Sequence, residues 1–173
     1  MKRLFLIIAA IALFSGAGLK VEAQTMKFGH INTDELIRAM PEYDSAMAKL
    51  QREQKQLLNT LEIMQVEFNN KYEAYNKEAK NLTDLVRQTK EQELADMSKR
   101  IQDFQVQAQN QLQEVQANLT KPIFDKVEKA IKDVGKEGGF IYVFDVAQSQ
   151  IRYFDETKSV NVLPQVKAKL GLK

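Results

Sequence analysis

The sequence predicts a mostly helical α+β protein, in which a long antiparallel helical hairpin projects from a small β body made by both ends of the chain. Three observations support this prediction. Apolar residues follow a heptad pattern across residues 36–68, and a second pattern of matching length covers residues 94–119. Residues typical of strands gather only before the first pattern and after the second, near residues 28–32 and 140–154.

The first arm of the hairpin is predicted to begin near Pro41, after a short helical turn, because proline is favoured at the first position of a helix. No further glycine or proline occurs before residue 81, so about 40 residues can form a rod of roughly 60 Å. Its apolar strip needs a partner helix, a partner chain or a bound protein to cover it. With one interruption at Gln54, the strip comprises Leu36, Met40, Tyr43, Met47, Leu50, Leu57, Leu61, Met64 and Phe68.

The pattern resets near residues 81–84, where Asn81 or Thr83 can cap a new helix, and this segment is the predicted tip of the hairpin. Folding back at Thr83 places Phe68 opposite Met97 and its neighbours. Pro122 lies within the second helical pattern, and its missing N–H predicts a bend that can serve as a hinge. The second strip comprises Leu94, Met97, Ile101, Phe104, Ala108, Leu112, Val115 and Leu119.

The β body is predicted from segments at both ends of the chain. A strand near Phe28 is followed by Thr33, a candidate N-cap. Residues 140–144 and 151–154 are expected to pair as a β-hairpin around a turn at residues 148–149, with the strand near Phe28 joining them. A last short helix is expected to start at Asn161 and end at Gly171. This prediction assigns residues 24–40 and 123–173 to the β body and residues 41–122 to the hairpin.

The first residues have the pattern of a signal peptide. Lys2 and Arg3 precede an apolar run over residues 4–14, and Val21 and Ala23 supply small residues for cleavage after residue 23. A retained membrane anchor is the alternative, but the run is short for a span of about 20 residues. The protein has no cysteine, which excludes a lipid-anchored lipoprotein and disulfides. These features predict export to a bacterial periplasm.

The charge balance argues against nucleic acid as a partner. The full chain has 25 basic and 23 acidic residues, and removal of residues 1–23 takes away three basic residues and one acidic residue. The mature chain is therefore neutral, whereas phosphate binding needs a basic surplus or a basic face. Neutrality also provides little attraction to anionic lipid.

No pattern in the sequence predicts an enzyme, a metal site or a cofactor. His30 is the only histidine, so neither a histidine metal cluster nor a proton relay can form. There is no glycine-rich phosphate loop and no G-x-S-x-G motif. Asp145 and Asp155 stand at expected strand ends, where turn and solvated roles outweigh catalysis.

Four segments, taken in order, resemble the OmpH-like (Skp) family of periplasmic chaperones. They are Phe28–Asn32, Met40–Tyr43, the run from Leu119 to Ile131 around Pro122, and Gly139–Asp145. The resemblance covers nearly all of the mature chain, and it depends on the order and spacing of these segments together.

The resemblance implies a homotrimer whose β bodies associate and whose three hairpins hang down as tentacles. Unfolded outer-membrane proteins would be held in the cavity between them. The family tends to have basic tentacle tips, whereas residues 71–100 of this protein hold seven basic and six acidic residues. This tip does not predict binding to lipopolysaccharide or to an anionic membrane.

Two sets of residues are candidates for function. Contact with an unfolded protein is expected from aromatic and methionine side chains, which adapt to varied apolar shapes: Met64, Phe68, Tyr72, Tyr75, Met97 and Phe104. The same spacing also suits a seam between the two arms, and both roles are compatible if each side chain is partly exposed. Trimer association is expected from the β residues Phe28, Ile31, Ile141, Val143, Ile151 and Phe154.

The leading hypothesis is an ATP-independent holdase, which binds unfolded chains and slows their aggregation without a covalent step. The alternative is a structural coiled coil, an envelope spacer or adaptor with one fixed protein partner. The steps of four from Met64 through Phe68 to Tyr72 form a stutter that favours the holdase over a uniform rod.

Overall fold

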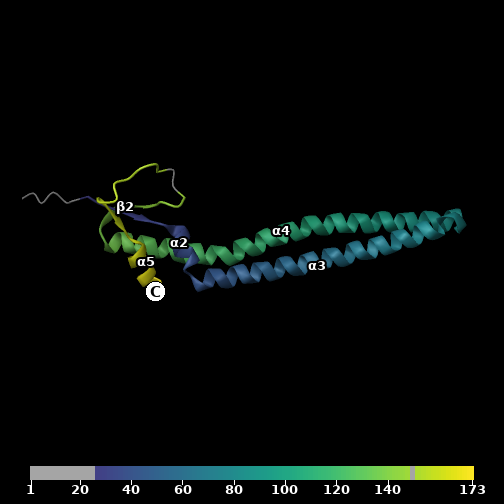
Figure 1. Cartoon of the computed structure of the whole chain (residues 1–173), viewed down its shortest axis with the longest axis horizontal. Coiled ribbons are helices and arrows are strands. Elements are labelled where there is room, and N and C mark those ends of the chain that lie inside the picture. Colours follow the sequence, from purple (N-terminus) through teal and green to yellow (C-terminus); the bar gives the residue numbers. More distant parts are fainter. Residues whose placement is uncertain (1–25, 149–150) are drawn as a thin grey trace, which may run out of the picture.

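A computed structural model describes residues 26–148 and 151–173 of the protein. The predicted signal peptide, residues 1–23, lies outside the described residues. Two long helices lie side by side and project from a small body that contains the strands, the short helices and the C-terminus (Figure 1). The predicted α+β class and the long antiparallel hairpin are thus confirmed.

The arms of the hairpin are helices α3 (Pro41–Glu78) and α4 (Asp84–Glu137). Pro41 opens α3, as its fixed φ predicts. A 3₁₀ turn, η1 (Ala79–Asn81), ends the first arm, and Thr83 caps the second by accepting a hydrogen bond from the backbone N–H of Val86 at 3.5 Å. The predicted tip and its threonine cap are therefore confirmed.

The register between the arms is constant from the base of the hairpin to its tip. Polar contacts between the arms mark this register at three levels. In each pair the midpoint of the two residue numbers lies between 82 and 84, at the tip. The pairs are Glu42 with Lys126, Glu53 with Gln111, and Tyr75 with Glu91, each with 2.5 Å between donor and acceptor. A constant register is what two helices of matched heptad period maintain when they fold back on each other.

The sheet differs from the prediction. Strands β1 (Lys27–Ile31), β2 (Phe140–Asp145) and β3 (Ser159–Asn161) pair in the order β2-β1-β3, and both pairings are parallel. The predicted antiparallel β-hairpin is wrong, and residues 151–154 form no strand. The apolar segment 151–154 contributes side chains instead of a strand: the Phe154 ring packs on His30 and Phe144. Tertiary packing has overridden strand propensity here.

Two short helices complete the body, and both begin at residues other than those predicted. Helix α2 (Thr33–Arg38) is capped by Asn32, whose side chain accepts from the Glu35 N–H at 3.0 Å. Thr33, the predicted cap, instead donates its hydroxyl hydrogen bond to Asp145 at the end of β2. Helix α5 (Leu163–Lys169) starts after Asn161, which belongs to β3.

A small apolar core joins the sheet to the base of the arms. Its most buried side chains come from β1, α2, the α2–α3 junction and the C-terminal segment, and they are Ile31, Leu36, Met40, Val162 and Val166. Gly29 lies beneath Val162 so closely that a Cβ at residue 29 would approach Val162 Cγ1 to 3.1 Å. The absence of a side chain on Gly29 therefore lets the C-terminal segment close over the sheet.

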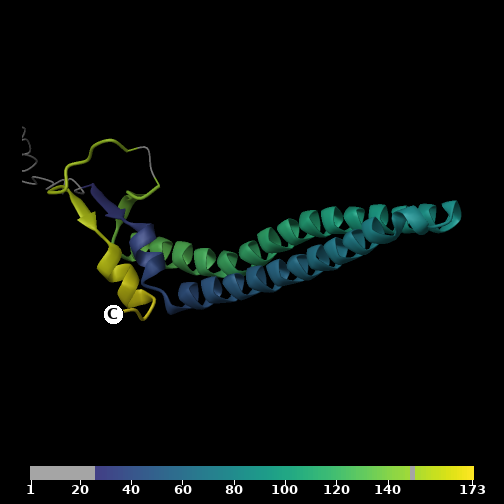
Figure 2. The same cartoon turned by 45° about the vertical axis from the view of Figure 1, so that its right-hand side comes forward.

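Helix α4 runs without interruption through Pro122 and into the body. Beyond the proline, its buried face contributes Ile123, Val127, Ala130 and Val134 to the core. Figure 2 shows that α4 is bent where it passes the beginning of α3. One helix thus belongs to both the arm and the body, and the loss of one backbone hydrogen bond at Pro122 accounts for its bend.

We expect Pro122→Ala to straighten α4 and to raise the free energy of unfolding by about 1–3 kcal/mol, because alanine restores the N–H and the helix propensity. The absence of native cysteine allows spin labels at Gln105→Cys and Lys136→Cys, two exposed positions of α4 on either side of Pro122, whose distance distribution reports the bend. Gln116→Ala, an exposed change on the same helix, serves as the control. An unchanged distance distribution would exclude Pro122 as the cause of the bend.

Candidate functional site

The described residues contain no group of three or more His, Asp or Glu placed to hold a metal ion. His30 hydrogen-bonds through Nδ1 to the Ser159 hydroxyl at 2.8 Å and lies against the ring of Phe154, which are structural contacts. In residues 26–148 and 151–173, no helix is long and apolar enough to cross a membrane. The surfaces left to consider are the two arms and the outer face of the sheet.

The predicted binding residues on the arms divide between the seam and the surface. Met97 is only 4% exposed and lies between the two helices, so it belongs to the seam. Tyr72 is 49% exposed and stacks on Phe68, with 6.1 Å between ring centroids. The other four of the set are half-buried: Met64, Phe68, Tyr75 and Phe104. The structure thus buries Met97 in the seam and leaves part of each of the other five side chains accessible.

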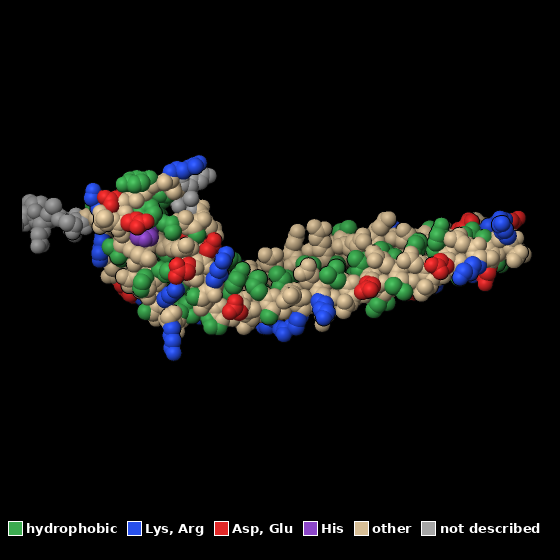
Figure 3. Space-filling view, viewed as in Figure 1, with side chains coloured by type: hydrophobic (Ala, Val, Ile, Leu, Met, Phe, Trp, Pro, Cys, Tyr) green, Lys and Arg blue, Asp and Glu red, His purple; other side chains and the backbone are tan. Residues whose placement is uncertain are grey.

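A second group of apolar side chains on the arms is exposed away from the seam. A search along the heptad positions misses this group, because its members lie between those positions. The sequence did contain a signal for this group: apolar residues at helix positions that face solvent when two helices pack only on each other. The group comprises Leu58, Ile63, Val66 and Val106, of which Ile63 is 67% exposed, and Leu85 and Val86 are also exposed near the tip. Apolar patches occur along the hairpin between charged side chains (Figure 3).

Charges of both signs are interspersed along the arms, as Figure 3 shows. Most ion pairs join residues four apart on one helix, such as Lys99 with Asp103 and Lys121 with Asp125, each with 2.7 Å between nitrogen and oxygen. Exposed pairs of this kind contribute little to stability. The arms therefore present no field of one sign that could attract a highly charged ligand.

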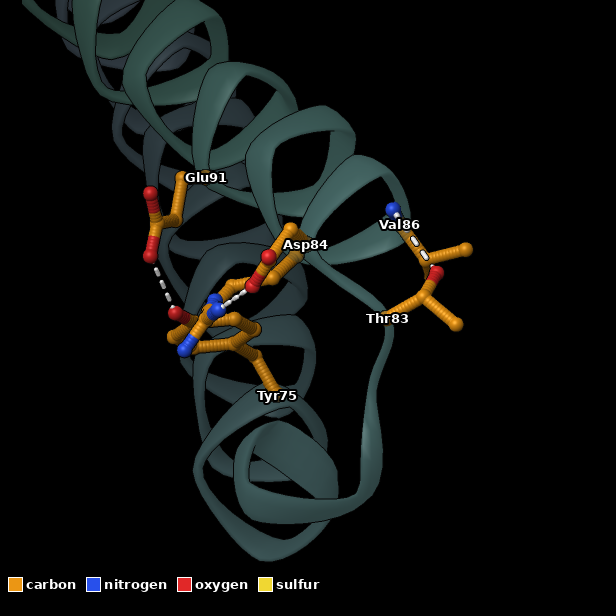
Figure 4. Close-up of polar contacts among 6 residues, drawn as sticks. Tyr75, Thr83, Asp84, Val86 and Glu91 are labelled. Carbon is orange, nitrogen blue, oxygen red and sulfur yellow. Dashed lines mark hydrogen bonds and ion pairs between the residues drawn. The ribbon is translucent and has the colours of Figure 1, made fainter.

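Polar contacts fasten the tip of the hairpin (Figure 4). The Tyr75 hydroxyl donates a hydrogen bond to Glu91 on the other arm, and this bond raises the pKa of Tyr75. Asp84 pairs with Arg87 in the first turn of α4, where the helix dipole favours an acidic residue. The Tyr75–Glu91 bond joins the two arms at the tip, and the Asp84–Arg87 pair and the Thr83 cap hold the first turn of α4.

Aromatic side chains gather on the outer face of the sheet, away from the helices. Phe28 stacks on Tyr142 with 6.2 Å between centroids, and Phe144 meets Phe154 edge to face at 5.2 Å. Tyr142, which is not among the residues predicted for association, is 65% exposed. This face and the neighbouring loop form an apolar surface of the body.

The six predicted association residues occupy different positions in the body. Ile31 is 1% exposed and belongs to the apolar core, and Val143 packs toward Gly29 on the same inner face. Phe28 and Phe154 are half-buried on the outer face, while Ile141 and Ile151 are exposed. The latter four therefore have accessible surface, whereas Ile31 and Val143 support the sheet from within.

Met97→Ala should lower the free energy of unfolding by about 2 kcal/mol, because it leaves a cavity in the seam that a two-helix arm closes only partly. Val106→Ala, on the exposed side of the same helix, should change it by less than about 0.5 kcal/mol. Urea unfolding followed by circular dichroism compares the two. Equal effects would show that the seam does not stabilise the hairpin.

The clamp between Glu42 and Lys126 at the base of the arms should depend on pH. The hydrogen bond from Lys126 is the main cause that lowers the pKa of Glu42 below its usual 4.5. The clamp therefore stabilises the fold fully at pH values above the pKa of Glu42 in the unfolded chain. This stabilisation is lost as the pH falls through the lower pKa that Glu42 has in the folded protein.

The measurement is the free energy of unfolding between pH 6 and pH 3, compared with Glu42→Gln. The difference in free energy of unfolding between the wild type and Glu42→Gln should be largest near pH 6 and should vanish near pH 3. Glu62→Gln, an exposed change higher on α3, should show no such convergence. A difference that is independent of pH would contradict the clamp.

A family profile described as "Outer membrane protein (OmpH-like)" matches residues 27–170, which is almost the whole described part of the protein. No curated protein gives a significant match. The OmpH-like family is one of periplasmic chaperones that bind outer-membrane proteins, and its members are not enzymes. The extent of the match and the hairpin that projects from a small parallel sheet lead to the same conclusion: this protein belongs to the OmpH-like family of outer membrane protein chaperones.

Proposed function

We propose that this protein is an ATP-independent periplasmic holdase that binds unfolded outer-membrane proteins between helical arms and prevents their aggregation. The observation that carries the proposal is the set of aliphatic and aromatic side chains exposed along the arms, away from the seam. An unfolded polypeptide presents its own apolar residues to such a surface. Binding lowers the concentration of free unfolded chains, so their aggregation slows without any energy source.

The physical requirements of a holdase match the surface of the arms. Many separate apolar contacts, each weak, can accept clients of different sequence, since no single shape has to be matched. Interspersed charges keep the arms soluble between these contacts. The apolar contacts come from Leu58, Ile63, Val66, Tyr72 and Val106, together with the exposed parts of Met64, Phe68, Tyr75 and Phe104.

A homotrimer follows as part of the same proposal. One hairpin encloses no cavity, whereas three hairpins held at their bases surround one. The outer aromatic face of the sheet, with the exposed side chains of Ile141, Tyr142 and Ile151, supplies apolar surface for this association. An apolar surface of this kind on a small body is typical of an interface between subunits.

The predicted signal peptide supports a periplasmic location for the mature protein. A holdase that works only by binding needs no nucleotide and therefore suits a compartment outside the cytoplasm. Client binding requires that the hairpins of the trimer reach around an unfolded polypeptide, and a hinge at Pro122 would let each hairpin pivot as a unit near the body.

The holdase is tested by mixing the mature protein with a urea-unfolded outer-membrane β-barrel protein and following light scattering on dilution. Suppressed aggregation near one trimer per client supports the proposal. No suppression would favour a structural spacer with one fixed partner. The molar mass from static light scattering tests the trimer independently.

Ile63→Gln combined with Val66→Gln should weaken client binding about tenfold, since each lost contact buries about half an aliphatic side chain, worth about 0.7 kcal/mol. Asn69→Gln combined with Asn70→Gln, one turn further along α3, is the matched control. Helix content and molar mass should stay unchanged in both. Undiminished protection by the first variant would show that clients bind elsewhere.

A further inference from the structure

A groove lies at the base of the hairpin, between the first turns of α3 and the part of α4 around Pro122. Its volume is about 460 Å³, within the range of about 300–1,000 Å³ that is usual for ligand sites. Its floor is apolar and comes from Met40, Ala46, Leu119 and Ile123. Three of these belong to the buried core, so the floor is held in place by the packing of the body.

The rim of the groove carries an excess of positive charge. It holds one carboxylate, Glu42, and two lysines, Lys49 and Lys126. The Glu42 carboxylate accepts a hydrogen bond from Lys126 at 2.5 Å and is occupied by it. Lys49 forms no ion pair or hydrogen bond with any of the described residues, so its ammonium group faces solvent at the edge of an apolar surface. One positive charge above an apolar floor is complementary to a carboxylate attached to an apolar group.

Two prolines lie at the level of the groove. Pro41 starts α3 after a change of direction at Met40, and Pro122 lies beside it in α4. The arms meet at this level through the buried side chains of Ala46 and Ile123 and through the Glu42–Lys126 pair. The groove runs along the side of this contact, and Pro41, Pro122 and Lys49 are among the residues that line it.

We propose that this groove binds a short apolar segment of a client protein in which a carboxylate lies next to an aliphatic or aromatic side chain. The assignment to a client rests on the proposed holdase function. The apolar side chain lies on the floor, and the carboxylate pairs with the Lys49 ammonium group. The C-terminal carboxylate of a polypeptide and the side chain of Asp or Glu offer the same chemistry, and the test separates these two sources.

The test measures the anisotropy of fluorescein-labelled peptides with the intact mature protein. One peptide ends in Ser-Leu with a free carboxylate, a second is its C-terminal amide, and a third is amidated and ends in Leu-Glu. The free acid should bind at least fivefold more tightly than the amide. Binding of the third peptide as tightly as the first assigns the site to Asp and Glu side chains as well, and binding of the first alone assigns it to C-terminal carboxylates.

Lys49→Gln should weaken binding of the free acid about fivefold and leave the amide unchanged. Lys55→Gln, an exposed lysine on the same helix outside the groove, is the matched control and should change neither. Ser45→Trp places a large ring at the exposed rim and should abolish binding of both peptides. Equal affinity for acid and amide, or no effect of Lys49→Gln, would overturn the proposal.

Two further readouts separate the proposals. If the Ser45→Trp variant changes the molar mass in light scattering, a second copy of this protein occupies the groove and the peptide proposal is overturned. If the peptides bind as expected while the wild-type protein fails to suppress aggregation, the groove stands as a binding site and the holdase function fails. If the protein protects clients but the peptides do not bind, the holdase function stands and the groove is not the binding site.

Discussion

Two helices packed only on each other can cover one strip of each helix, and every other side chain of the pair remains in contact with solvent. This geometric limit governs the protein. In the arms, Met97 is covered because it lies in the strip, while Ile63 on the opposite side of α3 has nothing to cover it. A globular protein would bury such residues in a third layer. Here they remain available along the length of a projecting hairpin.

The same limit explains why the body is needed. A narrow seam provides little stability for its length, so the arms depend on a base where more layers meet. Val162 and Val166 from the C-terminal segment, Ile31 from the first strand and Leu36 from α2 pack together where α4 enters the body. The N- and C-terminal parts of the protein are thus required to close one core, and the arms are held by a single continuous helix that passes from that core into the hairpin.

Much of the hairpin was predictable from sequence because its determinants are local or periodic. Thr83 caps α4, as expected from its place where the apolar pattern resets. The heptads predict the register between the arms, which agrees with the Glu53–Gln111 and Tyr75–Glu91 contacts. Strand pairing was not predictable in this way. Apolar runs such as 151–154 satisfy strand propensity, but whether such a run pairs by its backbone or packs by its side chains depends on its tertiary surroundings, here the rings of His30 and Phe144.

The fold class, the length of the arms, the position of the tip and the lack of enzyme motifs could all be read from the amino-acid sequence, since they follow from periodicity, capping chemistry and composition. Which apolar residues are covered depends instead on the three-dimensional packing. The parallel order of the sheet, the burial of Ile31, the exposure of Ile63 and Val66, and the open groove beside Lys49 all arise from contacts between residues far apart in the sequence. Such contacts depend on the relative placement of whole elements, which no local pattern encodes.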